Sequence, residues 1–316
     1  MSDLYELTGE PAPPSPVVVV ALEGWVDAGL AASTACAALT EAIDLRTYAT
    51  FDDERLIDFR ARRPQLRIVD GVAESLSFAR PVLQVGFDPV GNGVALLSGP
   101  EPDFAWRSFA ASVLELAQAM GARMLVGLGG FPAGAPHTRP VRLAATASKP
   151  ELAREVGYVD GTIEVPAGAQ AALERAFALA GIPSVGLWAR VPHYVSAMPF
   201  APASLALLEG LSHVSGLSID PGMLREAAVA ARRKVDELIN QSPEHAAMVR
   251  QLETNVDVLE GAPALTEADV PSGDEIAAEL ERYLRGGDEF GESDDFGESG
   301  AGGEDLDDSG NEDDDR

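Results

Sequence analysis

The stretch LVGLGGFPAGAPHTRPV, Leu125 to Val141, leaves an apolar run through glycines and then passes a histidine, a threonine and an arginine. Such a segment is compatible with phosphate binding, with catalysis, or with a simple turn at the end of a strand. Its glycines lack the GxGxxG spacing of a dinucleotide site, and neither GxxxxGK[ST] nor GxSxG occurs in the sequence. We therefore expect a strand over Arg123–Leu128, followed by a loop.

Strand and helix patterns alternate on both sides of this stretch. The apolar run Val17–Leu22 predicts a strand buried on both faces, and Asp27 is placed to cap a helix over Ala28–Ala42. Short β-rich runs between Gln65 and Gly99 predict antiparallel strands, with a hairpin connection at DPVGNG. Further strands are expected over Leu45–Phe51, Val141–Ala147, Thr162–Val165 and Ile182–Ala189, and helices over Asp103–Met120 with Asp103 as its cap, Pro150–Val156, Ala167–Ala180 and Ala203–Leu211. This order predicts an α/β fold, a three-layer α/β/α sandwich with a mostly parallel sheet and an antiparallel insertion.

Composition divides the chain into four parts. Residues 1–15 hold three prolines and predict a flexible N-terminal arm, and residues 16–220 form the α/β core domain. Residues 221–285 contain three amphipathic segments and predict a C-terminal helical region, whose last helix starts at Ser272 with Glu275 in a capping box. Residues 286–316 are acidic, and we expect this tail to be disordered because it has few apolar residues to bury.

Composition also excludes several classes of function. The formal net charge is −28, and there is no basic stripe with interleaved aromatic residues, so nucleic-acid binding is excluded. No apolar run approaches the roughly 20 residues of a membrane helix, and no secretory signal opens the sequence, which predicts a cytoplasmic protein without membrane contact. The single cysteine, Cys36, is expected to be a buried reduced thiol. The four histidines are widely spaced, so neither a metal nor a cofactor is predicted.

Candidate site residues gather at one edge of the predicted sheet, because ligand sites in open α/β sheets lie outside the carboxyl ends of the strands. That edge collects the loops EGWVDAG, FDDERLIDFR, GGFPAGAPHTR and VPHYVS. The candidate ligand- or partner-binding residues in them are Glu23, Trp25, Asp27, Asp52, Arg60, Gly129, Gly130, His137, Thr138, Arg139, His193 and Tyr194. None of them is assigned as catalytic.

Each candidate also has a structural interpretation. Asp27 either forms a carboxylate pair with Glu23 or caps a helix. Asp52 and the arginines that follow it either clamp an anion or pair with one another at the surface. His137 either binds phosphate or acts as a base, or it is a polar loop residue without a partner.

Four segments, taken together, resemble the actinobacterial branch of the PAC2 family, which is named for a proteasome assembly chaperone subunit. They are VVVVALEGWVDAG, FDDERLIDFRARRP, GLGGFPAGAPHTRP and PSGDEIAAELERYLR, and the resemblance covers residues 16–285. It implies a phosphorylase/hydrolase-like sandwich and self-association into a homo-oligomer, with a trimer as the expected form. Relatives that dock into proteasome α rings end in a hydrophobic residue, a tyrosine and any residue. This sequence ends in NEDDDR, so we expect any such contact to use the body or the helices.

Two functions of different classes follow from these observations. The first is a non-enzymatic protein-interaction or assembly factor, with proteasome core subunits as the implied partners. The second is a small-molecule-binding protein or a hydrolase- or ligase-like enzyme that uses the loops at the carboxyl ends of the strands. A carboxylate and His137 within about 3 Å of a common point would favour chemistry, whereas side chains that pair locally would favour assembly.

Overall fold

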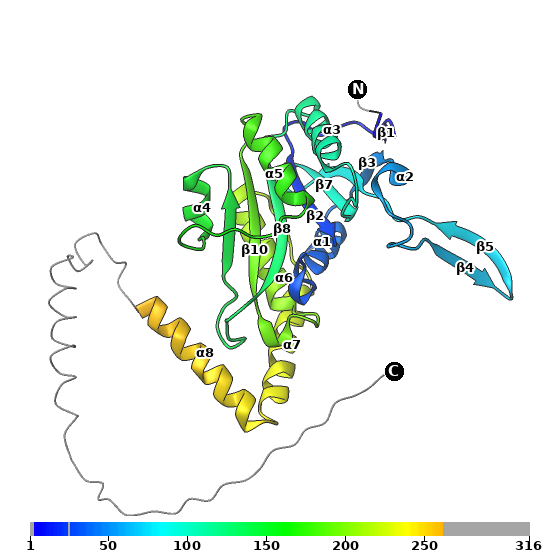
Figure 1. Cartoon of the computed structure of the whole chain (residues 1–316). Helices are drawn as coiled ribbons and strands as arrows, with labels where there is room; N and C mark the ends of the chain where they lie inside the picture. The colour runs from blue at the N-terminus through cyan, green and yellow to red at the C-terminus, as the bar shows by residue number, and fades with distance from the viewer. Residues whose placement is uncertain (1–2, 25, 262–316) are drawn as a thin grey trace, which may run out of the picture. The chain divides into compact units, whose positions relative to one another are not determined.

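The computed structural model describes residues 3–24 and 26–261, which fold as an α/β/α sandwich around one eight-stranded sheet (Figure 1). The strand order is β1-β3-β6-β7-β2-β8-β10-β9. The candidate Trp25, the expected helix at Ser272 and the acidic tail lie outside the described residues. The predicted fold class is confirmed.

The four central strands are parallel and hold the core. They are β7 (Gly93–Pro100), β2 (Val17–Glu23), β8 (Met124–Ala133) and β10 (Ser184–Pro192). Residues 17–21 of β2 are buried, as expected for a β-branched run with helices on both faces. The carboxyl ends of the four parallel strands lie at the same edge of the sheet, so the segments that follow these strands are brought together.

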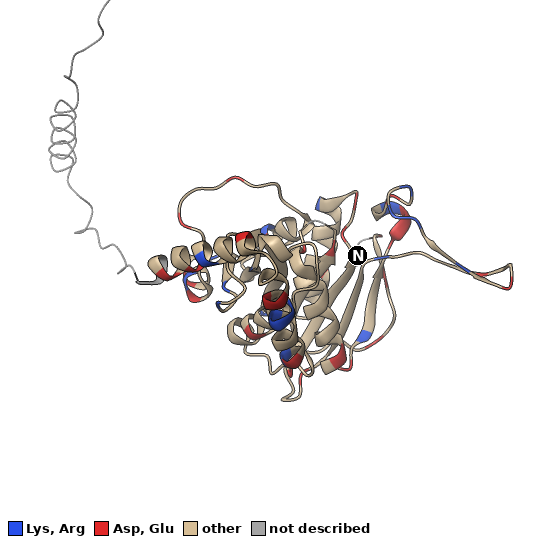
Figure 2. Ribbon diagram, turned by 90° about the horizontal axis from the view of Figure 1, so that it is seen from below, with Lys and Arg blue, Asp and Glu red and all other residues tan. Residues whose placement is uncertain are grey.

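The remaining strands of this sheet are antiparallel to their neighbours. They are β1 (Tyr5–Leu7), β3 (Arg46–Phe51), β6 (Val82–Phe87) and β9 (Leu143–Ala147). Fewer strands of the sheet are therefore parallel than expected. The chain runs from β6 through the DPVGNG turn into β7, and both strands join the main sheet as antiparallel neighbours. A separate two-stranded hairpin, β4 (Gln65–Val69) and β5 (Val72–Ser77), projects from the body (Figures 1 and 2).

The N-terminal segment differs from the flexible arm expected for residues 1–15. Strand β1 pairs with β3 at the edge of the sheet, and Leu4 is only 1% exposed. The Tyr5 ring packs edge-on against Phe51, with ring centroids 6.1 Å apart. These apolar contacts hold the segment that precedes the prolines against the body.

Helices cover both faces of the sheet. One face carries α1 (Ala31–Ala42), α4 (Pro150–Val156) and α6 (Ala201–Ser215), and the other carries α3 (Trp106–Ala119) and α5 (Ala169–Leu179). Helix α2 (Asp53–Leu56) is a single turn after β3, α7 (Leu224–Ile239) packs on α6, and α8 (Pro243–Gly261) follows α7. The extended piece expected at Thr162–Val165 has no regular structure. Within the described chain, no helix is both long and apolar enough to cross a bilayer.

Two expected helix caps have different outcomes. Asp27 accepts hydrogen bonds from the backbone N–H groups of Ala32 (2.7 Å) and Ser33 (3.0 Å), so it does cap the helix. A 3-10 turn over Ala28–Leu30 delays the start of α1 by three residues. Asp103 was wrongly expected to cap α3. Its carboxylate instead accepts from the backbone N–H of Asp58 at 2.8 Å.

Asp88 joins two distant turns. Its buried carboxylate accepts hydrogen bonds from the backbone N–H groups of Val90 and Asn92 in the β6–β7 turn, and from Ser218 in the segment between α6 and α7 at 2.8 Å. Burial opposes ionisation, but these hydrogen bonds outweigh it and lower the pKa of Asp88 below its ordinary value. The carboxylate therefore ties the α6–α7 connection to the sheet.

We expect Asp88→Ala to lower the free energy of unfolding by about 2 kcal/mol or more, since it leaves several donors without an acceptor. A lowered folded pKa stabilises the fold above the ordinary aspartate pKa of about 3.9, and that contribution is lost as the pH falls through the folded value. Denaturant titrations should therefore show a large difference at pH 7 that shrinks in acid. Asp220→Ala is the control, because the Asp220 carboxylate is exposed and bonds to Gly222 within the same segment. Equal effects of the two variants would contradict the role of Asp88.

Candidate functional site

Three of the four glycines in Leu125–Val141, at positions 127, 129 and 130, belong to strand β8, which continues to Ala133 instead of ending at Leu128. A Cβ atom on Gly129 would overlap the Trp188 ring, and one on Gly130 would lie 2.9 Å from the Ala28 carbonyl oxygen. Both residues are therefore glycines because neighbouring elements pack closely against the strand, and not because a phosphate needs space. The loop itself begins at Gly134.

His137 lies in the loop after β8 and is buried, with 1% of its side chain exposed. Its backbone N–H donates to the Tyr194 hydroxyl oxygen at 2.8 Å, and its ring Nδ1 lies 2.7 Å from the same oxygen. Ring Nε2 lies 3.0 Å from Oδ1 of Asp236, on α7. A carboxylate only accepts, so in the neutral ring Nε2–H donates to Asp236 and Nδ1 accepts the Tyr194 hydroxyl proton. Every polar group of this network then has a partner.

This network corrects the expectation that His137 lacks a partner. A carboxylate does lie 3.0 Å from the ring, which is the distance expected of a catalytic pair, but Asp236 comes from a helix that was not considered. Both ring nitrogens are occupied by protein groups. Burial also raises the pKa of Tyr194 to about 12, so its hydroxyl is not activated as a nucleophile. The arrangement acts as a link between elements.

Thr138 and Arg139 continue this link to α8. Arg139 forms a two-point ion pair with Asp257, through Nε at 2.9 Å and Nη2 at 2.7 Å, and its Nη1 lies 3.2 Å from Glu253. The Thr138 hydroxyl donates to the same Glu253 at 2.5 Å. Glu253 and Asp257 are four residues apart and share one face of α8. Hydrogen bonding to Arg139 lowers the pKa of Asp257.

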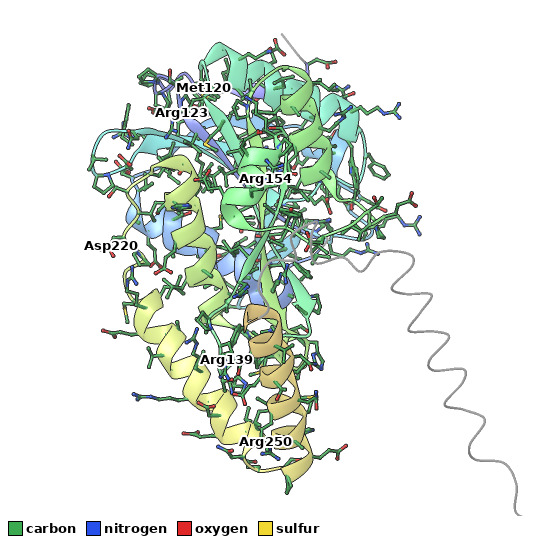
Figure 3. All side chains as sticks on the ribbon, turned by 90° about the vertical axis from the view of Figure 1, so that its left-hand side faces the viewer. Met120, Arg123, Arg139, Arg154, Asp220 and Arg250 are labelled. Atoms are coloured by element: carbon green, nitrogen blue, oxygen red, sulfur yellow. The ribbon has the colours of Figure 1, made fainter. Side chains whose placement is uncertain are left out.

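These six side chains form one unit, which we call the clamp: His137, Thr138 and Arg139 from the loop, and Asp236, Glu253 and Asp257 from α7 and α8. Figure 3 shows Arg139 beside these two helices. The clamp fastens the helical hairpin α7–α8 to the α/β body. We did not expect the three acidic partners, because His137–Arg139 was predicted to lie in a loop without contacts to the helical region. The spacing of the acidic residues can be read from the sequence, but the residues that they contact cannot.

The other candidates are placed separately. The Asp52 side chain accepts from the backbone N–H of Arg55 at 3.1 Å and caps α2, which gives this carboxylate a structural role. Glu23 and Arg60 have exposed side chains, and Glu23 is not hydrogen-bonded to Asp27 in the described chain. The His193 ring packs edge-on against Tyr194, with centroids 5.3 Å apart. The backbones of the candidate loops do meet, since Asp27 forms a β-bridge with Gly130 and the Gly29 N–H donates to the Ser196 carbonyl oxygen at 2.8 Å. Among the candidate side chains, those of His137 and Tyr194 are hydrogen-bonded to each other.

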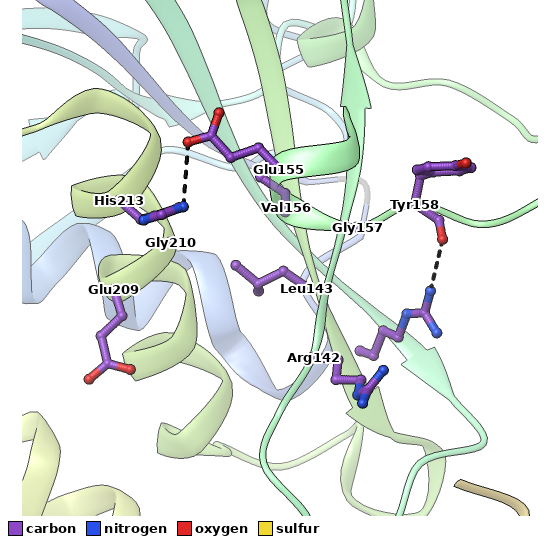
Figure 4. A pocket seen from close by; sticks show the side chains of 10 residues that line it. Arg142, Leu143, Glu155, Val156, Gly157, Tyr158, Glu209, Gly210 and His213 are labelled. Atoms are coloured by element: carbon purple, nitrogen blue, oxygen red, sulfur yellow. Dashed lines mark hydrogen bonds and ion pairs between the residues drawn. The ribbon is translucent and has the colours of Figure 1, made fainter. Parts of the chain in front are cut away.

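Two surface pockets of the described chain contain titratable residues. The first has a volume of about 490 Å³ and is lined from β9, β10, α4 and α6 (Figure 4). Arg142 and Arg190 lie opposite each other there, Nη2 of Arg190 is 3.5 Å from the Tyr158 carbonyl oxygen, and Nε2 of His213 is 3.4 Å from a Glu155 oxygen. Charges of both signs therefore line it. Neither arginine was among the candidates, because their pairing depends on the register of β9 and β10.

The second pocket has a volume of about 530 Å³, and its lining includes Glu23 and the single cysteine, Cys36. Burial raises the pKa of the Cys36 thiol to about 11, so the thiol is protonated at neutral pH and is a poor nucleophile. Across residues 3–24 and 26–261, His, Cys, Asp and Glu side chains form no group of three or more that could hold a metal ion.

Comparisons with known proteins agree with this architecture. The model of the PAC2 family matches residues 21–239. A PAC2 family protein from Streptomyces avermitilis is 38% identical, with a TM-score of 0.67 over 74% of this chain and 99% of that one. The proteasome-assembly chaperone homologue Rv2125 of Mycobacterium tuberculosis is 35% identical, with a TM-score of 0.69 over 74% and 99%. Rv2714 of the same species, described as a protein of unknown function, is 34% identical, with a TM-score of 0.77 over 83% and 93%. No curated protein sequence matches the chain.

The clamp predicts that Arg139→Ala loosens α8 without unfolding the body. The lost ion pairs are partly exposed and each contributes little, so we expect an increase of about fivefold in the local opening of α8. Hydrogen exchange of the α8 backbone should accelerate accordingly, while that of β2 and β8 stays unchanged.

Two further variants test this explanation. Arg139→Lys keeps the charge but loses the two-point geometry, and we expect an intermediate effect. Arg154→Ala is the matched control, because Arg154 is exposed and its pair with Glu151 on the same helix is 4.0 Å long. Unchanged exchange in α8 of Arg139→Ala would show that the clamp does not hold the helix.

Proposed function

Because the chain belongs to the PAC2 family, we propose that it is an assembly factor that binds proteasome core subunits and works in the cytoplasm as a homo-oligomer. The sequence similarity to Rv2125, described as a proteasome-assembly chaperone homologue, supports this role. A trimer is the form that the sequence resemblance implies. The net charge of −28 argues for a protein partner over a nucleic acid.

The clamp is the observation that carries the proposal. His137 and Arg139, two of the candidates for ligand or partner binding in the sequence, direct their polar atoms at α7 and α8. Their contacts fasten a helical hairpin to a closed α/β body, and an ordered surface lowers the entropy cost of binding a protein. Val229 and Leu238 on α7 expose about half of their apolar side chains. The two side chains are nine residues apart and therefore flank the buried stripe of α7 on opposite sides. We propose that the exposed surface of α7, reached from either side, receives the proteasome subunit.

The alternative, a small-molecule enzyme, has weaker support. A general base needs a nitrogen or oxygen that can reach the substrate, and protein groups occupy both ring nitrogens of His137. The pKa values of Tyr194 and Cys36, raised by burial to about 12 and about 11, favour the protonated and less nucleophilic forms. These observations favour binding over catalysis.

A capture experiment tests the proposed function. We expect the purified full chain to capture proteasome α subunits or their assembly intermediates, and deletion of the protein to slow maturation of the core particle. The double variant Val229→Asp/Leu238→Asp should reduce capture by about tenfold or more, because two apolar contacts are replaced by charges. Leu179→Asp is the control, because Leu179 is an exposed apolar residue of α5, on the other side of the sheet.

Two results would contradict the proposal. One is that neither α subunits nor intermediates are captured and maturation proceeds at its normal rate. The other, which concerns only the surface, is that Leu179→Asp reduces capture as much as the α7 variant does. In that case the partner does not use α7.

A further inference from the structure

The pocket of about 490 Å³ beside β9 has no role in the proposed function. Strand β9 is the last strand of the sheet, so long side chains from both faces of the sheet can reach a pocket at this edge. The volume lies within the range of about 300–1,000 Å³ that is typical of small-molecule sites. We call it the edge pocket, and its lining includes Arg142, Leu143, Glu155, Val156, Arg190 and Glu209.

Both carboxylates in the lining of the edge pocket already have a basic partner. Glu155, in α4, has an oxygen 3.4 Å from Nε2 of His213 on α6 (Figure 4). Glu209, also on α6, has an oxygen 3.0 Å from Nη1 of Arg225 on α7. These two pairs connect α4, α6 and α7 around the pocket, and neither carboxylate requires a cation from a ligand.

Among the described residues, Arg190 has no such partner. Its Nη2 lies 3.5 Å from the Tyr158 carbonyl oxygen, and its Nε is buried without a hydrogen-bond partner. No carboxylate of the described chain forms an ion pair with this guanidinium, although acidic residues outnumber Lys and Arg by 51 to 23 in the sequence. Buried polar groups are nearly always hydrogen-bonded, and a partly buried charge without a counter-charge costs free energy. The group that the pocket lacks is therefore an anion.

A second arginine lies beside Arg190. The Arg190 backbone N–H donates to the Arg142 carbonyl oxygen at 3.0 Å, one pair beyond the Leu143–Ala189 register of β9 and β10. Like charges at directly opposed positions of neighbouring strands repel each other. An anion bound by both guanidinium groups would replace this repulsion by attraction. Guanidinium groups also match the planar geometry of a carboxylate, which they bind through two parallel hydrogen bonds.

The part of the lining that lies between these charges is aliphatic. In Figure 4, Leu143 lies between Glu155 and Arg142. Leu143 packs so closely on Gly210 of α6 that a Cβ atom on this glycine would overlap the leucine side chain. Both Leu143 and Val156 are half-buried against the apolar core. A ligand with its anionic group on Arg190 therefore has aliphatic side chains available for the rest of its surface.

The acidic residues limit the charge that the ligand can carry. Glu155 and Glu209 line the same pocket as the two arginines. A dianion such as phosphate is repelled by these carboxylates more strongly than a single carboxylate is. The lining therefore favours a ligand with one negative charge and an apolar body.

We propose that the edge pocket binds an aliphatic monocarboxylate, with its carboxylate on Arg190 and Arg142 and its apolar body on Leu143 and Val156. The carboxylate belongs either to a small organic acid or to the carboxyl terminus of a peptide, because both present the same group. The site is separate from the exposed surface of α7 and does not depend on a proteasome partner.

Ligand-observed NMR titrations of the full chain test this site. The probes are isocaproate, a branched aliphatic acid, and isocaproamide, which has the same body without the charge. We expect isocaproate to bind saturably, with a dissociation constant of about 1 mM or lower. The amide should bind at least about tenfold more weakly, because the charge-assisted hydrogen bonds are lost. Inorganic phosphate, which lacks the apolar body, should also bind at least about tenfold more weakly.

Three variants at two positions connect the binding to the arginines. Arg190→Gln should weaken isocaproate binding by at least about tenfold, and Arg190→Lys should have an intermediate effect, because it keeps the charge and loses the two-point geometry. Arg142→Gln should also weaken binding, and its side chain is exposed, so this change leaves the core intact. Arg154→Gln is the matched control, because Arg154 is an exposed arginine of α4 outside the pocket lining, and binding should change by less than about twofold.

Thermal unfolding establishes that each variant is folded. Isocaproate should also raise the unfolding midpoint of the unaltered chain more than that of Arg190→Gln, because a ligand stabilises only a protein that binds it. Equal midpoint shifts in the two proteins would place the ligand elsewhere.

A tripeptide distinguishes the two sources of the carboxylate. Glycyl-glycyl-leucine with a free carboxyl terminus is compared with its amide and with isocaproate. Tighter binding of the free tripeptide than of isocaproate assigns the pocket to peptide carboxyl termini, and weaker binding assigns it to small acids.

Four results would overturn the inference. They are that neither isocaproate nor the free tripeptide binds, that acid and amide bind equally, that phosphate binds as tightly as isocaproate, and that Arg154→Gln weakens binding as much as Arg190→Gln. The α7 variant Val229→Asp/Leu238→Asp should bind isocaproate as the unaltered chain does. Failure of the edge pocket and failure of the proposed function are therefore observed separately.

Discussion

The structure depends on a buried histidine whose polar groups are satisfied by side chains from two other elements. His137 belongs to the loop after β8, Tyr194 follows β10, and Asp236 lies on α7. If α7 moved away, Nε2 would lose its acceptor in a place that water reaches poorly, and a buried donor without a partner costs roughly 1 to 3 kcal/mol. The helical region is therefore held in one arrangement by a requirement for hydrogen-bond satisfaction and not by apolar packing alone. Arg139 extends the same constraint along α8.

The sequence predicts best where a pattern is local. Val17–Leu22, the helix at Pro150–Val156 and the cap at Asp27 need only neighbouring residues, and the structure confirms them. The extent of β8 was missed because glycines usually end strands, whereas here Trp188 and Ala28 pack so closely that a side chain would not fit. The clamp was missed for a related reason. His137 and Asp236 are 99 residues apart, and no local pattern shows that the two meet. The alternation of strands and helices predicted the fold class, and the family resemblance implied the same sandwich, but neither predicted these contacts.

Binding a protein partner is favoured by surfaces that are ordered before the partner arrives, and this chain orders two exposed surfaces by different means. The helices α7 and α8 are held to the body by charged and polar side chains, while Val229 on α7 stays about half exposed. The β4–β5 hairpin is shaped by its own turn and by the Phe59–Phe78 contact at its base. One surface is therefore fixed by long-range contacts and the other by local sequence.

The isolation of the hairpin also separates the evolution of its surface from the evolution of folding. Substitutions at Ile68 or Leu76 leave the core clusters untouched, because those side chains pack on neither of them. Lengthening the hairpin by one cross-strand pair would move its tip by about 3.4 Å, without any repacking of β2 or β8. Selection can thus alter the length and twist of one exposed two-stranded element while the stability of the α/β body is preserved.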